Sequence, residues 1–126
     1  MDLSHIAAFA FFAIGAVIAL NATQQIADGG IVPAYQAGIT AVDTYTFPND
    51  GRTFLHVKKG ANGCNVTVTT PATFRGKAVA DTVIAIGANT DQMIGPFPAD
   101  LYSDATGLVT VAFSEVTGLT VAVIRL

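Results

Sequence analysis

One histidine and the single cysteine lie close together in the middle of the sequence. His56 and Cys64 are separated by the segment Gly60–Gly63, which is typical of a turn. A cysteine thiolate beside a histidine is a candidate nucleophile, with the imidazole as its base. Activation of a thiol requires an electropositive, partly exposed setting, and a lone cysteine is more often a small buried residue. We therefore expect His56 on a strand surface and Cys64 in the core, without catalysis by the pair.

Acidic and hydroxyl side chains gather further along the chain. Asp100, Ser103, Asp104 and Thr106 offer the oxygen ligands that calcium prefers, but their spacing fits no defined calcium motif. His56 alone lacks the cysteine or acidic partners of a zinc site, and the glycine-containing loops match no phosphate-binding pattern. The sequence therefore predicts a protein that is not an enzyme and that uses no cofactor and no metal.

Composition and charge narrow the function classes. The 126 residues suffice for one domain, and only 12% of them are charged, whereas soluble proteins average about 25%. The net charge is −3, and every Lys and Arg lies at or after Arg52. No clustered basic face is available for phosphate contacts, so nucleic-acid binding is not expected. A single cysteine excludes a disulfide within the chain.

The N-terminal segment is apolar and has several interpretations. Ile6–Leu20 is an uninterrupted run of 15 apolar residues, whereas a membrane-spanning helix needs about 20. The run also has the length of the apolar part of a signal peptide, although no basic residue precedes it. We expect an apolar helical segment over residues 1–20. It is a helix that enters a membrane or contacts a partner, a cleaved signal, or a stretch upstream of the true translation start, so membrane contact stays open.

The rest of the chain predicts strands. Glycines and a proline in residues 21–43 predict an extended arm, and residues 44–126 predict a β-sandwich domain. Leu55 and Val57 alternate with polar residues, which is the pattern of a half-buried strand. Ala80–Ala88 is apolar on both faces and is expected at the centre of a sheet. The predicted strands are Thr44–Phe47, Thr53–Lys59, Asn65–Thr70, Ala80–Ala88, Gln92–Phe97, Leu108–Ser114 and Leu119–Leu126.

A proline-rich corner interrupts this series. Pro96 and Pro98 end a strand, and Ala99–Ser103 predicts a single helical turn in which Leu101 and Tyr102 cap the core. Strands spaced by about 8–12 residues and separated by Gly and Pro predict an all-β fold. We expect an antiparallel β-sandwich or jelly-roll-like barrel of six to eight short strands, with an N-terminal apolar helix. Its topology does not follow from the sequence.

Four sequence features, in this order, resemble a known group of proteins. They are NDGRTFLHVKK (49–59), VTVTTP (66–71), the corner GPFP followed by Tyr102 and GLVTV (95–111), and a final strand ending in RL (125–126). Over roughly residues 20–126 the chain resembles small β-sandwich head proteins of tailed bacteriophages, which are encoded near the major capsid protein. The resemblance implies a virion structural protein, namely a head decoration, cement or minor capsid component. It brings no active-site residues.

The resemblance also implies partners and a contact surface. The partners would be the major capsid protein or other virion subunits, with a homo-oligomer, by analogy a trimer. The alternative is a secreted or membrane-tethered β-sandwich binding module of the cell envelope, such as an adhesin or pilus-like subunit, in which Ile6–Leu20 is functional. Two exposed loops are the expected interface, and their candidate contact residues are Pro48, Asn49, Asp50, Gly51, Pro96, Phe97, Pro98, Leu101 and Tyr102.

Overall fold

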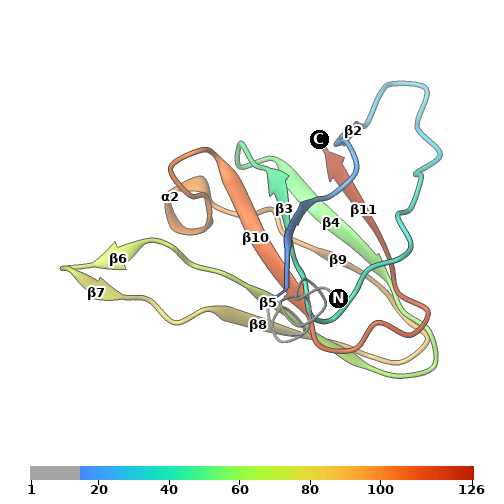
Figure 1. The fold of residues 1–126 in the computed structure, drawn as a ribbon. Coiled ribbons are helices and arrows are strands. Elements are labelled where there is room, and N and C mark those ends of the chain that lie inside the picture. Colours follow the sequence, from blue (N-terminus) through green and yellow to red (C-terminus); the bar gives the residue numbers. More distant parts are fainter. Residues whose placement is uncertain (1–14) are drawn as a thin grey trace, which may run out of the picture.

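The computed structural model describes residues 15–126, and this part of the chain is all-β (Figure 1). Its longer strands are β3 (Thr44–Pro48), β4 (Thr53–Lys58), β5 (Cys64–Val68), β8 (Thr82–Ile86), β9 (Asp91–Ile94), β10 (Leu108–Phe113) and β11 (Thr120–Arg125). Its shorter elements are β1 (Val17–Ala19), β2 (Gln24–Gln25), β6 (Thr73–Phe74), β7 (Lys77–Ala78) and the one-turn helix α2 (Ala99–Tyr102).

Two sheets form the body of the protein. The first has five strands in the order β1-β3-β10-β5-β8, and the second has four in the order β2-β11-β4-β9. Within them, β1 pairs parallel with β3 and β2 pairs parallel with β11, and the other pairings are antiparallel. Strands β6 and β7 form a separate hairpin that extends away from both sheets (Figure 1).

Side chains of both sheets form a single buried cluster. Val66 and Val111 of the first sheet are fully buried, as are Leu55 and Val57 of the second. Burial alternates residue by residue along β4 and β10, as a period of two predicts for strands with one face on a core. The predicted alternation is confirmed, and it fixes which side chains of each strand remain at the surface.

Strand β8 is an edge strand, so the prediction that Ala80–Ala88 is central was wrong. It pairs only with β5 among the described residues, and Val83 on its outer face is 59% exposed. The apolar residues of this strand cover the core on one face and leave the other face open. The described residues contain eleven strands instead of six to eight. The four additional strands have two or three residues, too few for alternation to be visible in the sequence.

The predicted apolar helix over residues 1–20 is not seen in its described part. Val17–Ala19 is strand β1, whose backbone groups pair with β3, and Val17 and Ile18 are β-branched residues that favour strands. The remainder of that prediction, residues 1–14, lies outside the described residues. Between residues 15 and 126 the helical content is one short turn, and no helix there has the length and apolarity needed to span a bilayer.

The arm, residues 21–43, pairs with the edge of β11, and its residues 26–35 reach over the outer face of the second sheet. Strand β2 pairs with the end of β11, and Gln36 exchanges two backbone hydrogen bonds with Val121, at 2.7 and 3.0 Å. This cover explains why Ala122 and Ile124, which point away from the core cluster, are only 2% and 3% exposed. Both faces of β11 are therefore buried.

Candidate interaction site

Two of the loops predicted as contact surface lie side by side at one end of the sheets. The first is the β3–β4 turn, Pro48–Arg52, and the second is the segment 95–107. We call these two loops together the loop end. The turn is held by its own side chains: the Asn49 Oδ1 accepts the backbone N–H of Gly51 at 2.9 Å, and the Asp50 Oδ1 accepts that of Arg52 at 3.0 Å. Gly51 has a φ of 88°, a conformation that side chains disfavour.

Asn49 joins the two loops. Its Nδ2 donates to the Phe97 carbonyl oxygen at 3.0 Å and to the Ser103 Oγ at 3.1 Å, and its backbone N–H donates to the Gly107 carbonyl at 3.0 Å. All the hydrogen-bonding atoms of this amide are thus used within the loop end. The two segments that the sequence singled out separately form one fixed surface.

Phe97 belongs to the core, which corrects its prediction as a contact residue. Its side chain is 3% exposed and packs against Phe47 and Tyr102, with ring centroids 5.6 and 5.5 Å apart. The neighbouring Pro96 and Pro98 are exposed, so a buried aromatic anchors a loop that presents its prolines to solvent.

The predicted helical turn over Ala99–Ser103 is confirmed as α2, and it holds the remaining candidates. Tyr102 packs against the core cluster, and its hydroxyl forms a 2.8 Å hydrogen bond with the Thr82 Oγ1 of β8. Leu101 is half-buried. The helix therefore caps the core as expected, and it also ties the loop end to the first sheet.

Asp104 has a structural role in the turn that enters β10. One carboxylate oxygen, Oδ1, accepts the Thr106 hydroxyl at 2.7 Å and the backbone N–H groups of Thr106 and Leu108 at 2.8 and 3.0 Å. These hydrogen bonds, that of the Thr106 side chain first, hold the pKa of Asp104 below its usual value. The carboxylate is satisfied by the turn itself, as expected of an acidic turn residue.

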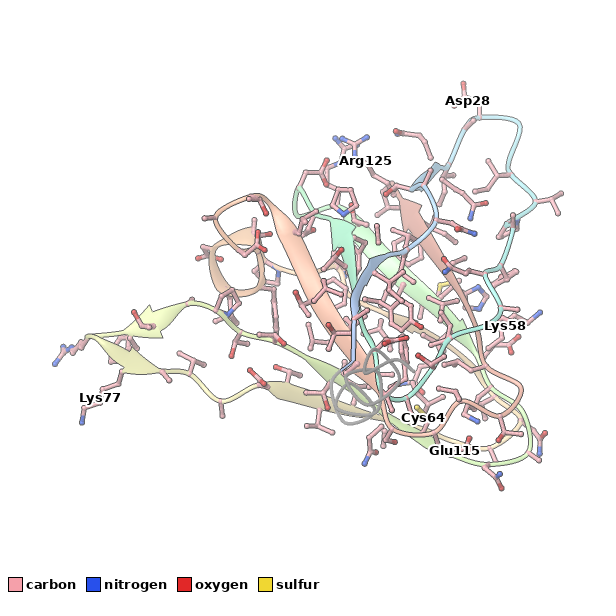
Figure 2. All side chains as sticks on the ribbon, viewed as in Figure 1. Asp28, Lys58, Cys64, Lys77, Glu115 and Arg125 are labelled. Carbon is pink, nitrogen blue, oxygen red and sulfur yellow. The ribbon has the colours of Figure 1, made fainter. Side chains whose placement is uncertain are left out.

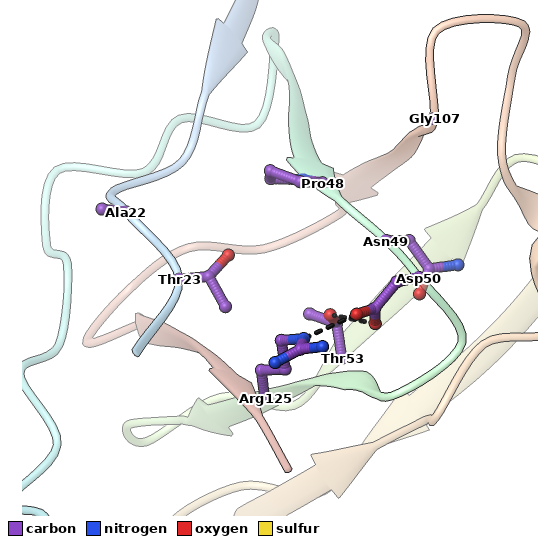
Figure 3. Close-up of a pocket in the computed structure, with 8 residues that line it drawn as sticks. All are labelled: Ala22, Thr23, Pro48, Asn49, Asp50, Thr53, Gly107 and Arg125. Atoms are coloured by element: carbon purple, nitrogen blue, oxygen red, sulfur yellow. Dashed lines mark hydrogen bonds and ion pairs between the residues drawn. The ribbon is translucent and has the colours of Figure 1, made fainter. Parts of the chain in front are cut away.

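A hollow of about 460 Å³ lies beside the loop end, between the β3–β4 turn and the arm (Figure 3). At its edge the Arg125 Nε donates to the Asp50 Oδ2 at 2.6 Å, and this hydrogen bond is the main reason that the pKa of Asp50 is lowered. The Thr23 Oγ1 is buried and has no hydrogen-bond partner among the described residues. The lining residues are Ala22, Thr23, Pro48, Asn49, Asp50, Thr53, Gly107 and Arg125.

Thr23 lines this hollow, but its hydroxyl oxygen is buried beneath the wall and is not exposed to a binding partner. Burial without a partner is unfavourable for a hydroxyl, so this side chain carries a local cost within the fold. Three of the predicted contact residues, Pro48, Asn49 and Asp50, line the same hollow. Sequence reasoning missed Thr23 and Arg125, which the pairing of β2 with β11 brings together, and Gly107, which the pairing of β10 with β3 brings beside Asn49. The sequence carries no signal of either register.

The structure separates His56 from Cys64. His56 lies on β4 of the second sheet, where its Nδ1 is 2.6 Å from the Tyr35 hydroxyl, while Cys64 is buried on β5 of the first sheet. A nucleophilic pair is therefore not formed. Within residues 15–126 no three His, Cys, Asp or Glu side chains gather closely enough to hold a metal ion.

Comparison with known proteins found no match for this chain, either among protein-family models, among curated proteins or among solved structures.

Proposed function

We propose that this protein is a virion structural protein that binds the capsid lattice as a head decoration, cement or minor capsid component. In this proposal the fold is an antiparallel β-sandwich or jelly-roll-like barrel. Its partners are the major capsid protein or other virion subunits, and its place is the virion. The order of the four sequence features that resemble phage head proteins supports the assignment.

The observation that carries the proposal is the joining of the two predicted loops into one surface by Asn49. A surface whose loops are already fixed loses little conformational entropy when it binds. The Asp50–Arg125 ion pair brings opposite charges together at the edge of its hollow.

The alternative, a secreted or membrane-tethered binding module, depends on the apolar segment Ile6–Leu20. Strand β1 takes three residues of that segment into the first sheet, so they cannot also lie in a membrane helix. No observation among the described residues favours this alternative over the capsid component.

Fractionation of the producing cells tests the class. Particles purified on a density gradient and washed cell envelopes are compared by quantitative mass spectrometry of peptides from residues 53–125. The proposal expects the protein in stoichiometric amounts in the particles. Recovery in the envelope with none in the particles would overturn it.

Binding of the purified protein to particles that lack it tests the surface. Pro48→Arg and Asp100→Arg place a bulky charge on exposed residues of the loop end and are expected to reduce binding at least about tenfold. Asn62→Arg is the matched control, because Asn62 is exposed in the β4–β5 connection at the other end of β4. Equal binding by all three variants would exclude the loop end as the contact.

A further inference from the structure

The hairpin β6–β7 forms a two-stranded sheet of its own and is exposed along its whole length. Its two residue pairs, Thr73 with Ala78 and Phe74 with Lys77, are made only within the hairpin, and residues 73–78 are all exposed. Figure 1 shows it extending beyond the two sheets. A two-stranded hairpin is marginally stable in water on its own, so a contact outside this copy of the chain would stabilise it.

The tip of the hairpin carries one aromatic residue and two basic residues. Arg75 and Gly76 form a two-residue turn with positive φ angles of 53° and 79°, where Asn or Gly is the usual first residue. Arginine at such a position is uncommon and strained. Phe74 is 67% exposed with the Arg75 guanidinium 5.3 Å from its ring centroid, and Lys77 lies opposite it. Exposed aromatic and arginine side chains together are typical of contact hot spots.

An apolar groove, which matches the apolar ring of Phe74, lies on the other side of the molecule. It runs between the arm and the outer face of the second sheet and has a volume of about 250 Å³. That is below the roughly 300 Å³ at which small-molecule pockets begin, so it suits one inserted side chain better than a ligand. Met93 in its wall is 64% exposed and Ile26 is 41% exposed. Its other lining residues are Ile31, Pro33, Tyr35, Phe54, His56 and Ile124.

Acidic residues flank this groove. Asp28 lies in the arm between the lining residues Ile26 and Ile31, and Asp91 precedes Met93 by two residues on the exposed side of β9. Neither carboxylate forms a salt bridge within residues 15–126. One base, Lys58, is the cross-strand neighbour of Asp91 in the β4–β9 pairing, and its ammonium is 4.9 Å from the Tyr35 ring centroid.

The basic tip and the acidic groove cannot meet within one molecule. Figure 2 shows Lys77 and Asp28 at opposite ends of the protein. A surface with two acids and one base around an apolar groove complements a tip with two bases around a phenylalanine.

We propose that copies of this chain associate head to tail, with Phe74 of one copy inserted into the groove of the next. Arg75 and Lys77 then face Asp28 and Asp91 of the neighbouring copy. Such a contact joins two different surfaces, so it closes into a ring or continues as an open chain. It uses neither of the two loops of the loop end and therefore goes beyond the proposed lattice contact.

Sedimentation velocity over a concentration series at low salt tests the contact. The wild-type protein is expected to associate as its concentration rises, and Phe74→Ala is expected to weaken association at least about tenfold. Val83→Ala is the matched control, because Val83 is a similarly exposed apolar residue outside the hairpin. A wild-type protein that stays monomeric, or a Phe74→Ala variant that associates like the wild type, would overturn the proposal.

Charge reversal provides a second, independent readout. The variants Arg75→Glu/Lys77→Glu and Asp28→Lys/Asp91→Lys each bring like charges together and are expected to remain monomeric alone. Mixed in equal amounts they again present opposite charges, so the mixture is expected to associate. All four residues are exposed, and circular dichroism verifies that both variants are folded. A mixture that stays monomeric while each variant is folded would exclude this pairing of surfaces.

Discussion

Lys59 carries its charge inside the protein. Its side chain is fully buried, and its Nζ donates to the Glu115 Oε1 at 2.6 Å and to the Thr117 carbonyl at 2.7 Å. The same carboxylate accepts the Thr117 hydroxyl at 2.6 Å. A buried ammonium is tolerated only with such partners, so the turn between β10 and β11 is organised around it.

The Lys59–Glu115 pair gives stability a defined pH dependence. The hydrogen bond from Lys59, followed by that from Thr117, lowers the pKa of Glu115 from 4.5 to about 2. Between these values the unfolded chain binds a proton that the folded chain does not, so protonation favours unfolding. The contribution is complete above about pH 4.5 and is lost as the pH falls to about 2. Urea denaturation at several pH values measures the effect.

Glu115→Gln isolates this contribution from that of other carboxylates. The variant is expected to be less stable than the wild type at pH 7 and to show a shallower loss of stability between pH 5 and pH 2. Asp100→Asn, which removes an exposed carboxylate on α2, is the control for the loss of one surface charge. Parallel pH profiles for wild type and Glu115→Gln would show that Lys59 does not hold this carboxylate ionised.

Asn49 is the residue on which the loop end depends most. Asn49→Ala removes three side-chain hydrogen bonds and leaves the Phe97 carbonyl and the Gly51 N–H without these partners. We expect a loss of about 1–3 kcal/mol in the free energy of unfolding. Asn49→Asp keeps the oxygen that accepts the Gly51 N–H but loses the hydrogen bonds that Nδ2 donates to Phe97 and Ser103. Its loss of stability therefore measures the contribution of the bridge between the loops without that of the turn. Asn62→Ala, at an exposed position, is expected to change stability by less than about 0.5 kcal/mol.

At the scale of the elements, the sequence predicted the strands that have one face on the core. Leu55 and Val57 in β4, and Val66 and Val68 in β5, alternate with polar residues because the other face meets solvent. The pattern indicates a boundary between core and water, not a position in the sheet. For that reason the apolar residues of β8 could not show that it lies at an edge.

The loop end was only partly predictable, because a local sequence pattern does not report contacts between residues that are distant in the chain. Proline and glycine chemistry located both loops correctly, because turn geometry is local. The bridge from Asn49 to Phe97 joins residues 48 positions apart, and no local pattern reports it. Likewise, the burial of Phe97 follows from its contact with Phe47 across the fold.

The arm is an element whose packing can be tested at one residue. Ile124 lies on the face of β11 away from the core cluster and is 3% exposed only because residues 21–36 cover it. Ile124→Ala is therefore expected to cost about 2–5 kcal/mol, as in a true core. Ile26→Ala, in the arm and 41% exposed, serves as the control and should cost much less. A small effect at Ile124 in urea denaturation would mean that the arm does not cover the sheet in solution.

One short chain segment, residues 17–25, pairs with both sheets. Strand β1 adds to β3 in the first sheet, and β2 adds to β11 in the second. Between them Leu20 donates its backbone N–H to the Thr46 carbonyl at 2.9 Å and places its side chain in the shared core. The apolar run Ile6–Leu20, for which a helix was predicted, thus ends in residues that link the two sheets.

Because of this link, truncation of the Leu20 side chain is expected to destabilise both sheets together. Leu20 is 7% exposed, and Leu20→Ala is expected to lower the free energy of unfolding by about 2–5 kcal/mol. Val17→Ala, in the same short segment but 72% exposed, should change it by less than about 0.5 kcal/mol. Urea denaturation is followed by far-ultraviolet circular dichroism for the strands and by tyrosine fluorescence, which includes buried Tyr45 of the first sheet. Because the two sheets share one core, the transitions reported by the two signals should shift together. Separate transitions in Leu20→Ala would mean that the sheets unfold independently and that this segment does not couple them.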